Sequence, residues 1–419
     1  MLYETYIYIF TYTYKMSPSY TVTSKTGYGS RIWNSIKAIG WGFLLIIWAI
    51  ILLWWNENNF VEQKAALEET EWVTVETSAD KIDASLDKSA IYINWKTSSP
   101  DESPLVDETF WVKTDDLKLI RRVEMYQWEE EEHTETEDNL GWSQTTTTTY
   151  TYNKVWSENH IDSSRFYKAG YENPSWKYDG QSYQKDPILL WAYTLSKHFV
   201  DMLTEELPVN LADQEITPIT WMQILDSLLY IGNNPQEPEI WDLKITFYRV
   251  PAWNASAVGQ QFADTLKPYT TSNHRSIGLL EQDNVTVHEL FEHAHSANQM
   301  MTWILRGIGF LLLWMWFSMI FSILETLAKV VPFIANIIWA ATGIVTFCLA
   351  LIVWLLTVAI AWLVVRPIYG ICALIAVIWI IVWLVYMGKK SPKKESVKED
   401  SHPIKDEPKD DLEPEIIEA

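Results

Sequence analysis

Residues Ile39–Trp55 read IGWGFLLIIWAIILLWW and contain no charged side chain. A helix of this length crosses most of a bilayer's hydrocarbon core, which is about 30 Å thick. The run ends in two tryptophans followed by Asn56 and Glu57, whereas a signal peptide would end in small residues at its cleavage site. We therefore expect a retained membrane helix over residues 38–56.

A second apolar region lies near the other end of the chain, from residue 307 to residue 387. Its charged residues are Glu325, Lys329 and Arg366. The uncharged stretch between Lys329 and Arg366 would form a helix of about 54 Å, too long for one simple crossing. We expect residues 331–341, with Pro332 and Gly343 as breakers, to form an interfacial or re-entrant segment.

These divisions predict three C-terminal crossings. They cover residues 303–324, 341–365 and 367–387, and the last begins at Pro367, a position that tolerates the missing N–H. Lysine and arginine flank the first helix on its N-terminal side and the last helix on its C-terminal side, so both termini are expected in the cytoplasm. The predicted cytoplasmic parts are residues 1–37, the segment 325–340 and a disordered charged tail over 388–419.

The predicted fold is an integral membrane protein with four transmembrane helices, one N-terminal and three C-terminal, and a large extracytoplasmic α+β domain. This domain covers residues 57–302 and contains 18 basic and 42 acidic side chains, a net charge of −24. The whole chain of 419 residues carries −22. Such acidity argues against nonspecific binding to nucleic acid. Whether translation starts at Met1 or Met16 is left open.

Several segments of this domain have the β-branched and aromatic composition of strands. They are Glu71–Glu76, Ala90–Trp95, Leu117–Trp128, Trp142–Trp156 and Asp242–Val250. The third and fourth flank a polar tip and predict a long hairpin. Helices are expected after Asp186-Pro187, within Ser196–Leu207, and from the capping box at Thr286 through Met300 into the second crossing. Residues Thr217–Leu229 fit either a helix or strands.

Motifs for catalysis, phosphate binding and metal binding are absent or incomplete in this sequence. There is no nucleophile elbow and no phosphate-binding loop, and the two cysteines, Cys348 and Cys372, lie in apolar runs. His288, Glu292 and His295 share one helical face and offer two nitrogens and a carboxylate, but the zincin spacing is missing, so we favour a hydrated polar face. We predict no enzyme activity, no cofactor and no metal.

Two other features suggest modification or cation binding. Seven acids lie between Glu129 and Asp138, but without a calcium-loop spacing they are expected to form a solvated hairpin tip. Asn254 and Asn284 begin N-glycosylation sequons on the side predicted to be lumenal.

Several blocks of the sequence resemble the LUMA proteins, the transmembrane protein 43 family. The resemblance covers most of residues 38–387, with the same order of one early crossing, a large domain and three late crossings. Asn58 and Trp241 replace residues that are usually glycine in the family. The matching residues are Glu124, Met125, Tyr126, Gln127, Trp128, Pro235, Pro238, Asp242, Leu243, Thr302, Trp303, Arg306, Arg366 and Pro367.

The resemblance implies a protein of the endoplasmic reticulum and inner nuclear membrane that self-associates, organises envelope complexes and contacts lamin and emerin-type partners. In a bacterium the same domain would be periplasmic. Our leading hypothesis is a non-enzymatic membrane scaffold that contacts membrane lipids and forms homo-oligomers. The alternative is a conductance or transport component built on the three late helices, with Glu325 and Arg366 as gate charges.

Overall fold

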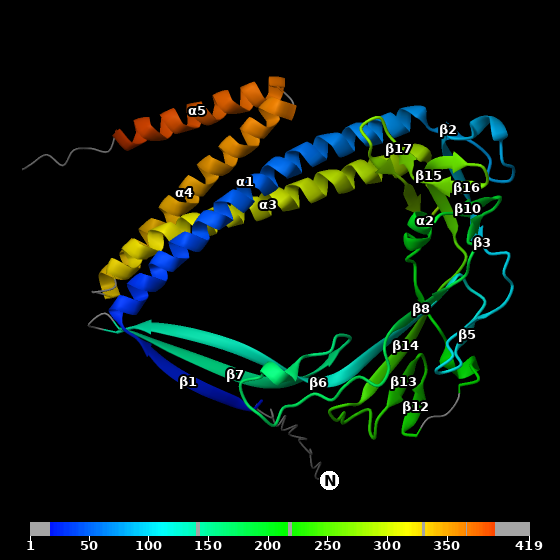
Figure 1. Ribbon diagram of the computed structural model, residues 1–419, viewed down its shortest axis with the longest axis horizontal. Coiled ribbons are helices and arrows are strands. Elements are labelled where there is room, and N and C mark those ends of the chain that lie inside the picture. The colour runs from blue at the N-terminus through cyan, green and yellow to red at the C-terminus, as the bar shows by residue number, and fades with distance from the viewer. Residues whose placement is uncertain (1–16, 140–142, 217–219, 329–331, 366, 390–419) are drawn as a thin grey trace, which may run out of the picture.

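Long helices and a strand-rich domain make up the computed structural model, which describes residues 17–139, 143–216, 220–328, 332–365 and 367–389. Helices α1 and α3 lie side by side and lead from the far end of the molecule into the strand-rich domain (Figure 1). A long hairpin extends from that domain back toward the N-terminal end of α1. The N-terminal segment 1–16 and the predicted tail from residue 390 lie outside the described residues.

Four helices account for the apolar segments. They are α1 (Tyr28–Val73), α3 (Val287–Ala328), α4 (Pro332–Val365) and α5 (Pro367–Lys389). The first three contain stretches long and apolar enough to cross a membrane, as the sequence predicts. The apolar stretch found in α5, Gly370–Ile380, is shorter, so a fourth crossing stays a prediction.

Two predictions about these helices are wrong. The strand expected at Glu71–Glu76 is the last turn of α1 followed by the short β2 (Val75–Glu76), because α1 continues out of its apolar segment and packs against α3. The break expected at Gly343 is also absent, since α4 begins at Pro332 and passes through Gly343 as one continuous helix, whereas an interfacial position for residues 331–341 stays a prediction. A glycine costs a helix only about 1 kcal/mol, far less than unsatisfied backbone groups cost in hydrocarbon.

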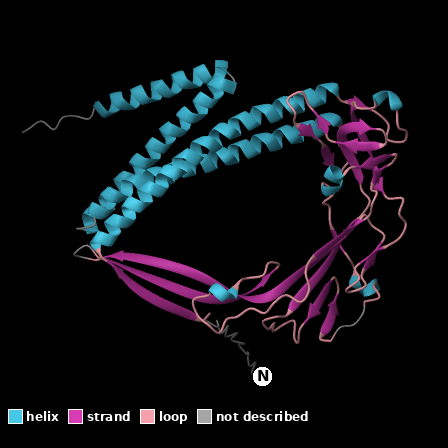
Figure 2. Ribbon diagram, viewed as in Figure 1, coloured by secondary structure: helices cyan, strands magenta, loops and turns pink. Residues whose placement is uncertain are grey.

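The larger sheet has eight strands and contains the predicted hairpin (Figure 2). Its main order is β1 (Ser19–Thr26), β7 (Gln144–Ser157), β6 (Lys118–Asp138), β14 (Leu243–Val250), β13 (Leu228–Ile231) and β12 (Met222–Leu225). Strand β8 (Gln181–Gln184) pairs with β6, and β11 (Leu207–Pro208) pairs with β14. The hairpin of β6 and β7 and the strand at Asp242–Val250 are confirmed. The ambiguous segment Thr217–Leu229 provides β12 and the start of β13.

The second sheet has seven strands and carries the short helix α2 (Lys197–Asp201) beside it, within the predicted span Ser196–Leu207. Its order is β19 (Leu279–Glu281), β15 (Asn254–Phe262), β16 (Thr265–Lys267), β10 (Tyr193–Leu195), β9 (Leu189–Leu190), β3 (Ala90–Ser98) and β2. Two small hairpins are β4 (Leu105–Val106) with β5 (Lys113–Thr114), and β17 (Tyr269–Thr270) with β18 (Ser276–Ile277). The helix expected after Asp186-Pro187 is absent, because the chain enters β9 and buries Ile188 and Leu190 in the core.

Strand β1 joins the N-terminal segment to the domain's sheet. It pairs antiparallel with β7 over eight residues, from Ser19 opposite Thr151 to Thr26 opposite Gln144. The sequence predicts residues 1–37 as a separate cytoplasmic segment, so this pairing was not anticipated. The long strands make it possible, because β6 and β7 extend far enough to meet the residues just before α1.

A small core couples the helices to the second sheet. Ala66 and Leu67 of α1 and Leu290 and Phe291 of α3 are buried together with Val258 of β15. Burying a side chain of the size of leucine, valine or phenylalanine contributes about 1.5–3 kcal/mol. The domain and the helix pair are therefore joined by packing as well as by the chain.

Candidate functional site at the helix junction

A buried ion pair joins α1 to α3 where their apolar segments meet the domain. The Arg306 Nε donates to Glu57 Oε1 at 2.6 Å, and Nη2 donates to Oε2 at 2.8 Å. The side chains are only 9% and 1% exposed. This two-point geometry between a planar guanidinium and a carboxylate is the strongest form of such a contact.

Indole rings surround the ion pair. Trp362 of α4 donates from Nε1 to Glu57 Oε2 at 2.6 Å, and Trp354 donates to the backbone oxygen of Arg306 at 3.0 Å. The guanidinium carbon lies 4.7 Å from the ring centre of Trp303 and 5.5 Å from that of Trp362. The ring faces attract the cation, so loss of water around the charges is compensated by specific contacts.

Polar side chains extend this junction along α1 and α3. The buried Asn56 donates from Nδ2 to the backbone oxygen of Thr302 at 3.1 Å. The Thr302 hydroxyl donates to the backbone oxygen of Asn298 at 2.8 Å, and Asn298 donates to that of Phe60 at 3.2 Å. These bonds fix how the two helices sit along each other, because a shift by one turn would leave buried polar groups unpaired.

Part of this junction is predictable from the sequence. Thr302, Trp303 and Arg306 belong to the matching family residues, whereas Trp354 and Trp362 were missed. For Glu57 the sequence predicts only that it follows the first crossing as a polar residue. An acid directly after one apolar run and an arginine directly before the next is a signal that could have paired them, since unpaired charges are costly there.

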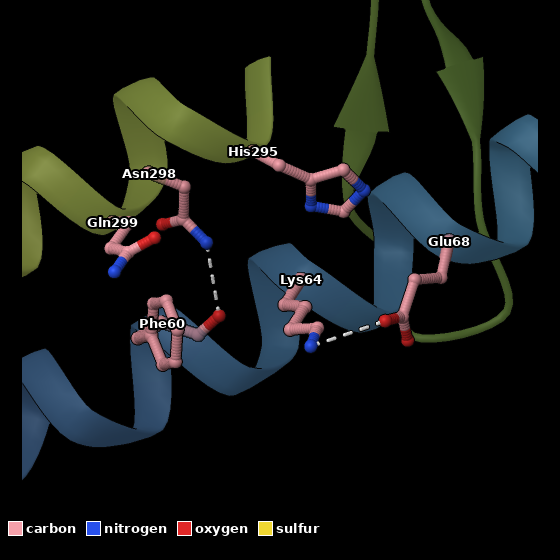
Figure 3. Close-up of a pocket in the computed structure, with 6 residues that line it drawn as sticks. All are labelled: Phe60, Lys64, Glu68, His295, Asn298 and Gln299. Carbon is pink, nitrogen blue, oxygen red and sulfur yellow. Dashed lines mark hydrogen bonds and ion pairs between the residues drawn. The ribbon is translucent and has the colours of Figure 1, made fainter. Parts of the chain in front are cut away.

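A polar cleft of about 240 Å³ lies between the same helices, further toward the domain (Figure 3). Phe60, Lys64 and Glu68 line it from α1, and His295, Asn298 and Gln299 line it from α3. Lys64 pairs with Glu68 at 3.4 Å along one face of α1. The cleft contains donors and acceptors but no arrangement of nucleophile and base.

The three residues weighed as metal ligands are not brought together. His288 Nδ1 lies 3.3 Å from Glu71 Oε1, and His295 Nε2 lies 3.9 Å from Glu71 Oε2. Glu292 takes part in neither contact. Over the described ranges no group of three histidine, cysteine or acidic side chains is placed to hold a metal ion. The histidines instead link α3 to the end of α1.

The family residues of the sheet have structural partners. Gln127 is buried and bonds the backbone of Asn159 at 3.0 Å and of Ile161 at 2.9 Å. The carboxyl group of Asp242 accepts from the Tyr230 hydroxyl, and burial followed by this contact raises the pKa of Tyr230. Met125 and Leu243 face each other across β6 and β14 in the core.

The remaining matching residues are near these strands or at helix ends. Glu124, Tyr126 and Trp128 lie on β6, Pro235 and Pro238 lie between β13 and β14, and Pro367 begins α5. Arg366 and Lys329 lie outside the described residues, as does the side chain of Glu325, so the structure does not place the predicted gate charges.

Glu131, Glu132, Glu135 and Glu137 of the acidic run are exposed, as are the two sequon asparagines. The acids from Glu129 to Asp138 lie in strand β6 and pair with β7 as a ladder rather than forming a ligand loop. Asn254 begins β15 and Asn284 precedes α3, and both are exposed. Asn284 accepts from Asn94 at 2.9 Å. Glycosylation of either asparagine stays a prediction.

The comparisons with known proteins match this chain to one family. The family model described as Transmembrane protein 43 matches residues 125–367. The rat Transmembrane protein 43 is 29% identical over 280 residues, covering 64% of this chain and 69% of the relative. The human protein is 26% identical over 363 residues, covering 83% and 89%. The homolog of Drosophila melanogaster is 26% identical over 351 residues, covering 80% and 90%.

No solved structure matches the chain. The family match covers more than half of it and includes most strands of the larger sheet, the ion-pair arginine and two apolar helices. The names of these relatives carry no enzymatic activity. The chain therefore belongs to the Transmembrane protein 43 family and is an integral membrane protein.

Proposed function

We propose that this chain is a non-enzymatic, multi-pass membrane scaffold that holds membrane-protein complexes through its strand-rich domain. The observation that carries the proposal is the continuity of α1 and α3 from the membrane into the domain, locked by Glu57 and Arg306. Such a frame keeps a binding surface at a fixed height and orientation above the bilayer. We include α5 in this proposal as the fourth crossing.

The domain offers a surface suited to binding other proteins. Large aromatic side chains, which are enriched where proteins bind each other, are exposed on it. Trp221 is 63% exposed and Trp253 is 38% exposed, and Ile224 on the edge strand β12 is 47% exposed. Following the family, we propose the endoplasmic reticulum and inner nuclear membrane as its location, with self-association and lamin or emerin-type proteins as partners.

Photocrosslinking in native membranes tests this proposal. A photoreactive amino acid at Ile224 or Trp253 is expected to give discrete protein adducts, either with a second copy or with one partner. The matched control is the same amino acid at Trp41, which is 68% exposed in the apolar segment of α1 and is expected to give lipid adducts. Uncrosslinked monomer at both domain positions would overturn the proposal.

A further inference from the structure

The larger sheet of the domain ends in an edge strand, β12. Among the described strands it is the last in the order and pairs only with β13. It lies at the end of the domain away from α1 and α3, so the apolar helices leave it accessible (Figure 1). An edge of this kind is a template on which another extended chain can pair.

The register shows which backbone groups of β12 are available. The Gly232 N–H donates to the carbonyl oxygen of Trp221 at 3.1 Å, so these two residues form a hydrogen-bonded pair just before β12 begins. Bonded and non-bonded pairs alternate along an antiparallel ladder. Met222 and Ile224 therefore direct their N–H and C=O groups away from β13, and each offers a donor and an acceptor to an added strand.

Strand β12 lacks the features that usually protect an edge from pairing. It contains no charged residue and no proline, and its register with β13 is unbroken. Ile224 and Leu225 are 47% and 41% exposed. Because lysine, proline and bulges are the common guards of an edge, this strand is suited to accept a partner.

A pocket of about 350 Å³ lies at the Trp221 end of the edge. Its rim includes the indoles of Trp221 and Trp241, which are 63% and 44% exposed. Lys177 also lines the pocket and repels a cationic side chain. The pocket therefore suits a large, neutral, apolar side chain. Its floor is buried and apolar and consists of Met125, Ile231 and Leu243.

The two rim tryptophans occupy backbone conformations that favour glycine. Trp221 has a φ of 68° and Trp241 a φ of 89°. A bulky residue in this region is a genuine outlier, and such strain concentrates at sites that bind ligands. Position 241 is usually glycine in the family, so the second indole is an addition of this chain.

The charge of the surrounding chain indicates the kind of partner. From Met202 to Leu243 there are eight aspartate and glutamate residues and no lysine or arginine. Glu215, Asp226 and Glu237 are exposed among them. A second copy would bring the same acidic surface and be repelled, whereas a basic partner would be attracted.

We propose that β12 binds an extended segment of a partner protein by strand addition, with a large apolar side chain of that segment in the pocket between Trp221 and Trp241. Lysine or arginine residues flank the paired stretch of the partner. Main-chain hydrogen bonds supply affinity in this mode, and the pocket supplies selectivity. The proposal rests on the scaffold function and adds the class of segment that the scaffold holds.

Fluorescence anisotropy with the full chain in phosphatidylcholine nanodiscs tests the proposal. The probe is a labelled synthetic peptide of alternating valine and threonine, with one tryptophan and with paired lysines at both ends. We expect saturable binding that weakens as salt is added. Replacing the lysines with glutamates should weaken it about tenfold.

Backbone methylation of the peptide tests strand addition directly. One peptide carries methyl groups on its valine nitrogens and another on its threonine nitrogens. Only one of the two should lose binding, because alternate residues of an added strand face β12. On the protein, Ile224→Pro removes an N–H that β13 does not use and should weaken binding about tenfold, whereas Ile224→Val should not.

A pair of glycine variants tests the pocket. Trp241→Gly removes an indole and suits the left-handed backbone, so the fold is retained and binding should weaken about tenfold. Trp191→Gly is the matched control. Trp191 also has a left-handed φ, of 54°, and is 48% exposed, but it lies between β9 and β10 in the second sheet, so binding should be unchanged.

Several outcomes would overturn the proposal. They are equal binding of the two methylated peptides, equal binding of the glutamate peptide, equal effects of the two glycine variants, and crosslinking of a photoreactive residue at Ile224 only to a second copy. Protein adducts at Trp253 without peptide binding at β12 would overturn this proposal and leave the scaffold function standing.

Discussion

Glu57 and Arg306 are 249 positions apart in sequence and form a two-point ion pair, with the arginine nitrogens 2.6 and 2.8 Å from the carboxylate oxygens. The chain leaves the first apolar segment at Glu57 and enters the second at Arg306. Every described strand of the domain except β1 therefore lies in one closed loop of the chain, whose two ends are joined at this ion pair.

Removing one member of this pair should be strongly destabilising. Arg306→Ala leaves the buried Glu57 carboxylate unpaired, and the expected cost is about 3–5 kcal/mol of unfolding free energy. Thermal unfolding in nanodiscs, followed by circular dichroism, measures the change. Glu57→Gln should cost less, because the amide can still accept from the guanidinium.

The control for this experiment is an exposed ion pair in the same chain. Lys197 and Asp201 lie 2.8 Å apart but are 82% and 54% exposed, so Lys197→Ala is expected to cost less than about 1 kcal/mol. Similar losses for Arg306→Ala and Lys197→Ala would contradict the assignment of the junction as a structural lock.

The pairing of β1 with β7 predicts a specific disulfide. Val22 lies opposite Thr148 in the register, so cysteines at these positions should crosslink on mild oxidation. The background chain carries Cys348→Ser and Cys372→Ser. A mobility shift on a non-reducing gel, reversed by reductant, is the readout.

Matched cysteines at Val22 and Thr147 point to opposite faces of the sheet and should crosslink poorly. If Val22 and Thr148 also fail to crosslink in intact membranes, β1 and the hairpin occupy different sides of the bilayer, as the charge distribution around the first helix predicts. The experiment therefore decides between the strand pairing and the predicted separation of residues 1–37.

Position 232 has to be glycine because the Asp242 side chain leaves no room for a Cβ atom. A Cβ at this position would overlap the Asp242 carboxyl group and lie 2.7 Å from a Tyr230 ring carbon. Gly232→Ala is expected to destabilise the sheet by about 1–3 kcal/mol, measured by chemical denaturation. Gly343→Ala in α4 meets no atom within 4 Å and should instead be neutral or stabilising by about 0.5–1 kcal/mol.

The start of α3 should respond to pH through His293. A hydrogen bond from the His293 Nδ1 to the Glu281 carboxylate, followed by the charge of that acid, raises the pKa of His293 above its usual 6.5. Because the folded pKa is the higher one, this contact stabilises fully below pH 6.5 and is lost as pH rises through the folded value. The protection factors of the backbone amides at the start of α3, which correct for the pH dependence of the intrinsic exchange rates, should be higher at pH 5.5 than at pH 8.5.

Glu281→Gln removes the charge and should abolish this pH difference while leaving the helix cap at Thr286 intact. An unchanged difference in that variant would show that the contact between His293 and Glu281 is not its cause.

The apolar segments and the hairpin were predictable because each has a strong local pattern. Ile39–Trp55 is uninterrupted, and the strands around Trp128 and Trp156 alternate over many residues. Thr286 and Glu289 form the predicted capping box, with the Thr286 N–H donating to the Glu289 carboxylate at 2.8 Å. These features depend on neighbours in sequence.

The features that were predicted wrongly or not at all depend on contacts between segments that are distant in sequence. The residues around Trp72 favour a strand locally, but packing of Leu67 against Phe291 keeps them in α1. Likewise, nothing near Trp362 in sequence indicates that its ring donates to Glu57, 305 positions away. Trp241 keeps a left-handed φ of 89° where the family usually has glycine, so the turn survives a substitution that local preference disfavours.

The continuity of α1 has a mechanical consequence. Measured from Glu57, the helix extends about 24 Å toward the domain and about 44 Å the other way, at 1.5 Å per residue. A rigid rod held at that point acts as an unequal lever. A sideways displacement of about 2 Å at the domain end would become nearly 4 Å in the opposite direction at Tyr28, so force applied to the domain on one side of the bilayer would be felt, enlarged, at the other end of the helix.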